Sequence, residues 1–446
     1  MISGLALVKG IADRLTRELG KNQAWVHAAE GYGPGCAPSI DICQPIVIDN
    51  IAALLYPTLS AIFFGITLHT PDQRRRYYFL LPLVIFPILS LNSARDLGLP
   101  IGIRTLWTHG VLLYILHVTS LLFIEQWPSS RPSHRSLKGL GVWWFKISTT
   151  LDLWTNFRMI ESHTSSQKIK SESRITFILL KIVKLLIYYY LHTALIPTLT
   201  QYLLGTISSK DLAISHRSLF AFTTLTTRDF SIRTYFSIHW IWESYIYLDS
   251  FHSLLSIISV ATAIDEPSSW PPLFSSPHNA TSFRSFWGKF WHKLISRSGS
   301  NYGRFIARSI FKLRSGSQIH DAVIAFVVFT LSGLIHSFVA WHHHVKSWDR
   351  DFRWFLLNFG IGVLEKRVVG WMRGMAKRFE ILREFQSIEQ SWMGSLLGYL
   401  WVLGFFWWSV PFWQYPRLEE QALQREWWSG YVERLRVIKE SRAVAV

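Results

Sequence analysis

A single histidine within a long apolar stretch has the side-chain chemistry expected of a catalytic residue. His336 lies in the segment 321–341, in the run Leu331-Ser332-Gly333-Leu334-Ile335-His336. An ionisable side chain at that depth is costly unless it faces the protein interior or water, so it is a candidate functional residue. Ser332 lies four residues earlier on the same helical face, and Gly333 removes bulk beside it. Because an imidazole has an ordinary pKa of about 6.5, it suits general-base chemistry. A core histidine held by one hydrogen bond is the alternative, and position alone does not choose between them.

A second histidine ends an aromatic run at residues 286–292, whose sequence is Phe286-Trp287-Gly288-Lys289-Phe290-Trp291-His292. Gly288 comes one turn before His292 and leaves room for a ligand or another backbone. The alternative for His292 is an interfacial side chain in contact with water, and Trp287 and Trp291 are also typical of membrane anchors. No G-x-S-x-G sequence offers a hydrolase-type nucleophile.

The remaining metal-ligating residue types do not form a pattern that predicts a metal site. His342, His343 and His344 are consecutive, and adjacent helical positions point in different directions. Cys36 and Cys43 are the only cysteines, too few for a disulfide framework or a four-cysteine site. A bridge between the two stays open. We therefore expect no bound metal.

The elements that carry these residues are predicted to be membrane-spanning helices. Hydrophobic residues make up 49% of the 446 positions, charged residues only 17%, and 22 residues are Trp. Such a composition excludes a soluble globular domain. A span needs about 20 mostly apolar residues. Eight stretches qualify, at roughly 46–69, 77–94, 105–125, 175–204, 235–264, 321–341, 354–371 and 392–413. The fold class is thus all-α and polytopic, a bundle of about eight to ten transmembrane helices, because the long fourth and fifth stretches could each contain a break.

The basic residues gather in the connections between these stretches, as in cytoplasmic loops. The net charge of +17 therefore does not indicate nucleic acid binding, for which no module is present. The loop 266–320 carries eight basic residues between Arg284 and Arg314, which places it in the cytoplasm, so the sequon at Asn279 is expected to stay unglycosylated. Aromatic and aliphatic residues from Phe283 to Ile295 recur at helical spacing, which predicts an amphipathic helix in the membrane interface before the span of His336. We divide the chain into an N-terminal segment 1–45, a membrane domain 46–415 and a basic tail 416–446.

The aromatic run ending at Trp291-His292, followed about forty residues later by Ser332-Gly333-x-x-His336, resembles the wax synthase-like branch of the membrane-bound O-acyltransferase superfamily. It is similar in particular to fungal acetyltransferases of terpenoid and meroterpenoid pathways. The run Trp270-Pro271-Pro272-Leu273-Phe274 matches the approach to the first motif. Asn156 and Arg158 match an Asn-x-Arg-Gly-Ile-Gly stretch, but Met159 and Glu161 replace both of its glycines. The resemblance covers about residues 46–415.

The resemblance implies a direct transfer of an acyl group from acyl-CoA to a hydroxyl. His336 would be catalytic and His292 its polar partner. Supporting or substrate-binding roles would fall to Trp287, Gly288, Trp291, Ser332, Asn156 and Arg158. We expect acetyl-CoA as co-substrate, no bound cofactor, and a terpenoid or meroterpenoid acceptor, that is, an apolar hydroxylated small molecule of secondary metabolism. The chain would lie in the endoplasmic reticulum membrane and bind no nucleic acid. Two alternatives remain, a long-chain wax or sterol ester synthase and a non-enzymatic membrane transporter.

Overall fold

A computed structural model describes residues 46–94, 101–128, 142–158, 173–217 and 225–444. Every regular element in these ranges is a helix. The chain divides into two compact units, residues 1–131 and 132–446, which are described separately. Cys36, Cys43 and the residues 159–161 lie outside the described ranges.

The first unit is a small helical bundle. Its helices are α2 (Ile46–Leu68), α3 (Gln73–Arg76), α4 (Leu80–Ser93) and α5 (Ile101–Thr119), the last continued by a π-helical turn, Ser120–Ile124. Ser60 of α2 shares a hydrogen bond of 2.9 Å with the Tyr114 hydroxyl of α5. Arg76, in a basic run expected in a loop, is buried, and its guanidinium donates to the carbonyls of Thr70 and Trp127. These carbonyl contacts offset the cost of removing the charge from water.

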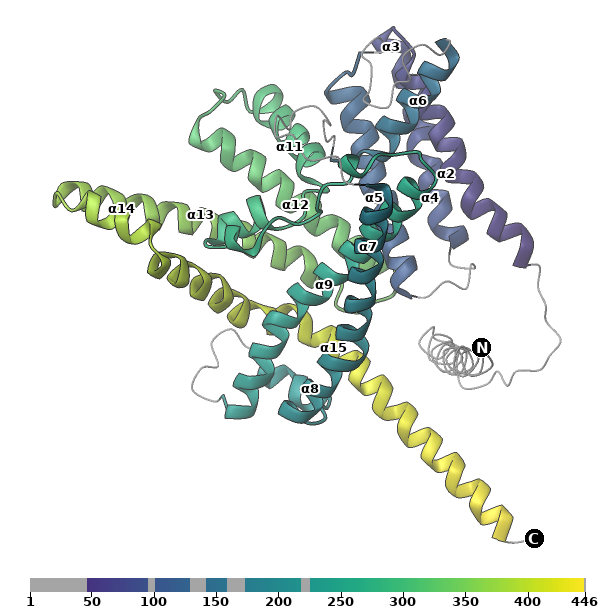
Figure 1. Cartoon of the computed structure of the whole chain (residues 1–446), viewed down its shortest axis with the longest axis vertical. Coiled ribbons are helices and arrows are strands. Elements are labelled where there is room, and N and C mark those ends of the chain that lie inside the picture. Colours follow the sequence, from purple (N-terminus) through teal and green to yellow (C-terminus); the bar gives the residue numbers. More distant parts are fainter. Residues whose placement is uncertain (1–45, 95–100, 129–141, 159–172, 218–224, 445–446) are drawn as a thin grey trace. The chain divides into compact units, whose positions relative to one another are not determined.

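The second unit contains the remaining helices (Figure 1). They are α6 (Val142–Thr155), α7 (Arg174–Tyr190), α8 (Ile196–Leu204), α9 (Thr227–Ala261), α10 (Phe283–Ser285), α11 (Ser296–Phe305), α12 (Gln318–His342), α13 (Asp349–Arg378), α14 (Leu382–Gln390) and α15 (Trp392–Val444). Helix α15, yellow in Figure 1, is continuous across residues 415 and 416, where we had divided the membrane domain from the basic tail.

Five helical segments of the described residues are long and apolar enough to cross a membrane, at 73–93, 102–124, 174–204, 318–342 and 392–434. They coincide with five of the eight expected spans, and Ala52–Leu68 within α2 is a shorter apolar helix. Helices α9 and α13 form where two further spans were expected but are not among the five. Helix α13 has Asp349, Asp351 and Glu365 among its charged residues, which lowers its apolarity. The all-α polytopic class is confirmed, with fewer strongly apolar spans among the described residues than the eight to ten expected.

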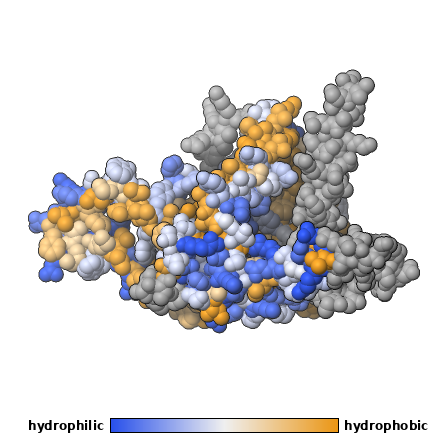
Figure 2. Space-filling model, turned by 90° about the horizontal axis from the view of Figure 1, so that it is seen from below, coloured by the Kyte–Doolittle hydropathy of each residue, from blue (hydrophilic) through white to orange (hydrophobic). Residues whose placement is uncertain are grey.

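The core of the second unit is an aromatic cluster centred on Trp240 of α9. The Trp240 ring lies 5.0 to 6.4 Å, between centroids, from rings of three other segments, the aromatic run, α13 and α15. These rings belong to Phe286, Trp287, Trp291, Trp354, Phe406 and Trp413. Many other apolar side chains face outward, and Figure 2 shows apolar residues interspersed with polar ones over α13 and α14, at the left of that view. An outward apolar surface of this kind is what a helix in lipid requires.

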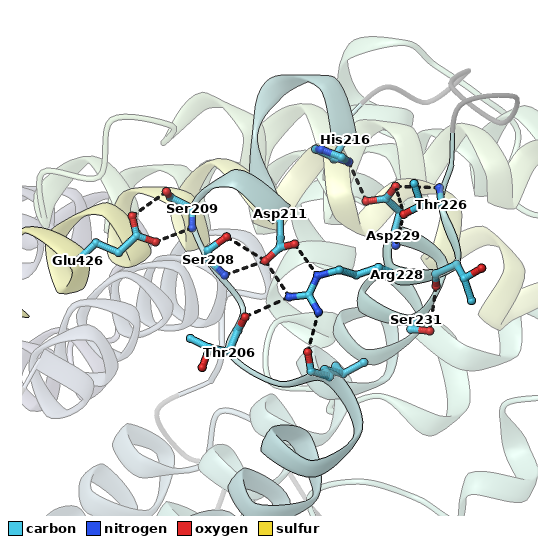
Figure 3. A network of polar contacts seen from close by, with 12 residues as sticks. Thr206, Ser208, Ser209, Asp211, His216, Thr226, Arg228, Asp229, Ser231 and Glu426 are labelled. Atoms are coloured by element: carbon cyan, nitrogen blue, oxygen red, sulfur yellow. Dashed lines mark hydrogen bonds and ion pairs between the residues drawn. The ribbon is translucent and has the colours of Figure 1, made fainter.

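A network of polar contacts fastens the connection between α8 and α9 to α15 (Figure 3). The Arg228 guanidinium donates to both carboxylate oxygens of Asp211, at 2.7 and 3.0 Å. Glu426 of α15 accepts from the backbone and hydroxyl of Ser209, at 2.7 and 2.8 Å. Thr226 and Asp229 cap the start of α9 reciprocally. These contacts give the network a structural role, because Arg228, Asp211 and Glu426 are each hydrogen-bonded within it.

Candidate functional site

His336 is positioned by the close approach of α12 to α13. A Cβ atom on Gly333 would lie 3.0 Å from the Cβ of Phe355 and 3.2 Å from the Cα of Phe352, so only glycine permits this separation. The Ser337 hydroxyl accepts a hydrogen bond of 2.9 Å from the backbone N–H of Phe352. As a result, the partly buried His336 ring stacks on Phe355 with centroids 4.9 Å apart. Ser332, on the same helix, is also partly buried.

A short helix, α10, leads into the aromatic run, and a carboxylate from α13 accepts hydrogen bonds from its first turn. Glu365, 9% exposed, accepts from the backbone N–H groups of Phe283 and Arg284 at 2.8 and 3.0 Å. A carboxylate suits this position because it satisfies the unpaired N–H groups at a helix start and opposes the helix dipole. The Trp401 indole donates to the same carboxylate at 3.1 Å. Helix α13 and helix α15 therefore fix where the run starts.

A helix does begin at Phe283, as expected, but the expectation that it continues to Ile295 is wrong. The helix ends at Phe290, and Trp291 has an extended backbone with φ −66° and ψ 154°. Ser275 accounts for the ending, because its N–H and hydroxyl donate to the carbonyls of Phe290 and Lys289 at 3.1 and 2.8 Å. The aromatic side chains are buried against α9, α13 and α15 rather than turned to lipid.

Trp287 and Trp291 belong to the core, while Gly288 is exposed. The Trp287 indole donates to the Asn358 side-chain oxygen at 3.1 Å, and the Asn358 amide donates to the Trp354 carbonyl at 2.7 Å. Trp291 is buried, with its ring stacked on Phe286 at 5.3 Å. A Cβ on Gly288 would meet no atom within 4 Å, so packing does not require glycine there.

His292 follows the helix end and approaches the region of His336. Its ring is partly buried and lies 5.7 Å from Phe274 and 5.6 Å from Trp291, between centroids. A series of ring contacts connects it with His336: Trp291 lies 5.7 Å from Trp287, Trp287 lies 6.1 Å from Phe355, and Phe355 lies 4.9 Å from His336, between centroids. The two histidines, separated by 44 positions in the chain, are thus brought into one neighbourhood bordered by aromatic rings.

Arg158 connects the end of α6 to the segment that precedes the aromatic run. Its guanidinium donates to the carbonyls of Pro271 and Pro272 at 3.4 and 3.2 Å. Burial lowers the pKa of this guanidinium below its ordinary value. Asn156 is partly buried, and its backbone N–H donates to the Asp152 carbonyl, which places it at the end of α6. Asn156 and Arg158 thus lie beside the segment that contains Pro271 and Pro272 rather than beside His292 and His336.

Helix α13 supplies polar groups that our reading of the sequence missed. Asp351, Asn358 and Glu365 are each buried on it, spaced by seven residues, so that they recur on one face. Three polar residues at this spacing within an apolar stretch could have been identified from the sequence, because polar groups buried in a membrane span are expensive and usually functional. Elsewhere, no group of three metal-ligating side chains occurs among the described residues, and His342, His343 and His344 sit at the end of α12. The absence of a bound metal stays a prediction.

Comparison with known proteins connects this arrangement to a family. Residues 270–357, which contain the aromatic run and His336, match the membrane bound O-acyl transferase family. The described helices make the chain an all-α polytopic integral membrane protein. No solved structure matches it.

Several curated fungal acetyltransferases are similar to the chain. Acetyltransferase atnC of Arthrinium sp is 27% identical over 211 residues, 47% of this chain and 47% of the relative. Acetyltransferase nanB of Aspergillus nanangensis is 32% identical over 167 residues, 37% and 39% of the two chains. Acetyltransferase TRI7 of Fusarium sporotrichioides is 28% identical over 183 residues, 40% of each. Each alignment spans less than half of the relative. The resemblance predicted from the motifs is confirmed.

Proposed function

We propose that this protein is a membrane-bound O-acyltransferase that moves an acetyl group from acetyl-CoA to a hydroxyl of an apolar terpenoid or meroterpenoid. The observation that carries the proposal is the neighbourhood of His336 and His292 within the segment that matches the acyltransferase family. The names of the similar fungal proteins support acetyl as the transferred group. We further propose the endoplasmic reticulum as the membrane in which it works.

The proposed reaction is a direct transfer. The imidazole of His336 takes the proton from the acceptor hydroxyl, and the hydroxyl oxygen attacks the carbonyl carbon of the thioester. The carbon–oxygen bond forms, the carbon–sulfur bond breaks, and the proton passes from His336 to the departing CoA sulfur. His292 orients the reactants or stabilises the negative charge that develops on the carbonyl oxygen.

The aromatic surroundings support an apolar acceptor. Phe355 stacks on His336, and Trp287 lies 6.1 Å from Phe355 between ring centroids. Large aromatic faces bind flat or polycyclic apolar molecules through area burial and favour few specific polar contacts. Arg158 and the Trp270–Phe274 segment hold the loop that leads to His292, which gives them a supporting role.

Purified protein in detergent tests the proposal directly. It should release CoA thiol from acetyl-CoA only when a hydroxylated terpenoid is added, and mass spectrometry should find the acceptor heavier by one acetyl group. Acyl-CoAs of increasing chain length, including palmitoyl-CoA, compete in the same reaction. Preferred transfer of palmitoyl would instead support a long-chain ester synthase, and no thiol release with any acceptor would contradict an acyltransferase.

A further inference from the structure

Arg417 lies in α15 just after the apolar stretch 392–413, in the part of the chain expected to be a basic tail, and its side chain is only 31% exposed. It is held there by an ion pair, and a carboxylate buried in a helix of this kind is expensive unless it has a partner. The carboxylate is that of Asp351 in α13, which accepts from the Arg417 guanidinium at 2.8 Å.

The Asp351 carboxylate holds Arg417 in a rigid setting. The carboxyl side chain is only 3% exposed, and its other oxygen accepts from the Trp413 indole at 2.5 Å. Trp413 in turn stacks on Trp354 with centroids 3.9 Å apart and an angle of 10° between the rings. Both oxygens of Asp351 accept a hydrogen bond, and Trp413, which donates one of them, is itself stacked on Trp354. Asp351 therefore holds the Arg417 guanidinium in a fixed position.

This ion pair lies beside His336. Phe355, on which the His336 ring stacks, comes one helical turn after Asp351 on α13. Arg417 and His336 are also close enough for their charges to interact. The Arg417 Nε is buried and donates to no acceptor in the described ranges. A guanidinium has five N–H donors, so the contact with Asp351 leaves donors for a further acceptor.

The other cations at this end of α13 and α15 are engaged elsewhere. Arg350 donates to the Phe412 carbonyl at 2.7 Å, and Arg217 is paired with Glu419. Lys346 lies 3.9 Å from Glu420 and is 88% exposed. Arg353 pairs with Asp349 and is 66% exposed. Arg417 differs from these four cations in combining a fixed position, a buried Nε–H without an acceptor among the described residues, and the neighbourhood of His336.

We propose that Arg417, positioned by Asp351, donates to the carbonyl oxygen of the transferred acyl group and stabilises the negative charge that forms there. This inference rests on the proposed acyl transfer. When the acceptor oxygen attacks, the carbonyl π electrons move to oxygen and the arginine N–H groups bind it. When the carbonyl re-forms, the carbon–sulfur bond breaks and CoA leaves. A fixed donor aimed at developing charge accelerates this step without binding the ground state more tightly.

The test compares Arg417→Gln, Asp351→Asn and the double variant in the acetyl-CoA assay. Removal of one such donor typically lowers kcat about 10²- to 10³-fold, so we expect this loss in Arg417→Gln with little change in KM for acetyl-CoA. Arg417→Lys keeps the charge but loses the fork of donors and should retain part of kcat. Arg436→Gln, which removes an exposed charge from the same helix, is the matched control and should turn over like the wild type.

The double variant separates a catalytic role from a structural one. Removing one partner leaves a buried charge unpaired, whereas removing both charges relieves that cost. We therefore expect the double variant to behave like the wild type in size-exclusion chromatography yet stay as slow as Arg417→Gln. Turnover at the wild-type rate by Arg417→Gln or by the double variant would overturn the inference and leave the proposed function intact. A wild-type protein that consumes no acyl-CoA would overturn both.

Discussion

The Glu365 carboxylate accepts two backbone hydrogen bonds from Phe283 and Arg284, residues 82 and 81 positions earlier in the chain. This contact starts the helix that carries Trp287 and leads to His292. The buried Glu365 carboxylate of α13 thus fixes the position of the aromatic run. The run belongs to a different segment from the helix of His336, so its position in the candidate site depends on this contact.

Replacing Glu365 by Ala should destabilise the protein and reduce its activity. The change leaves the N–H groups of Phe283 and Arg284 and the Trp401 indole without their acceptor, and a buried unsatisfied donor costs about 1–3 kcal/mol. Unfolding of the detergent-solubilised protein, followed by tryptophan fluorescence, measures this loss. Glu433→Ala, at an exposed pair with Arg436, is the control and should unfold like the wild type. Equal unfolding midpoints for the two variants would show that Glu365 does not stabilise the start of this helix.

His336 is expected to be catalytic rather than a packing residue. His336→Ala should lower acyl transfer about 10²- to 10⁴-fold, the usual contribution of a general base. Its expression and elution should stay near those of the wild type, because one intramembrane hydrogen bond is worth on average only about 0.6 kcal/mol. His336→Gln keeps a polar group of similar reach but cannot take the proton. Near-normal turnover by the Gln variant would show that His336 serves packing alone.

The loop 266–320 is predicted to face the cytoplasm. Asn279 is exposed, so it would be accessible to the glycosylation machinery if the loop were in the lumen. We expect glycosidase treatment to leave the mass of the protein from eukaryotic cells unchanged at this site. A mass shift that disappears in Asn279→Gln would place the loop in the lumen and contradict this prediction.

The contact between Asp211 and Arg228 should make stability depend on pH in the acid range. Hydrogen bonding from Arg228 holds the pKa of the Asp211 carboxyl at about 2, below its ordinary value of 3.8. Because the folded pKa is the lower one, the stabilisation is complete above the ordinary value and is lost as pH falls from 3.8 toward 2. Unfolding midpoints measured across this window should therefore fall less steeply in Asp211→Asn than in the wild type. Parallel curves would contradict this assignment.

The sequence by itself determined the class of fold and the residues from which the candidate site is built. Helices form at all eight expected stretches, because a run of about 20 apolar residues is a local property that neighbouring residues express together. The Ser332–His336 motif lies on one helix, α12, for the same reason. The spacing of motifs also predicted the resemblance to the membrane bound O-acyl transferase family, whose model matches residues 270–357.

Only the tertiary structure decided which distant groups meet. The helix expected to reach Ile295 ends at Phe290 because Ser275 caps its carbonyls, and no periodicity within the run contains that information. Arg417 reads as part of a basic tail until Asp351, 66 positions earlier, is found to hold it beside the span of His336. Hydrogen bonds and ion pairs between buried groups depend on where separate helices cross. That crossing follows from the packing of whole aromatic faces, such as those around Trp240, rather than from any local pattern.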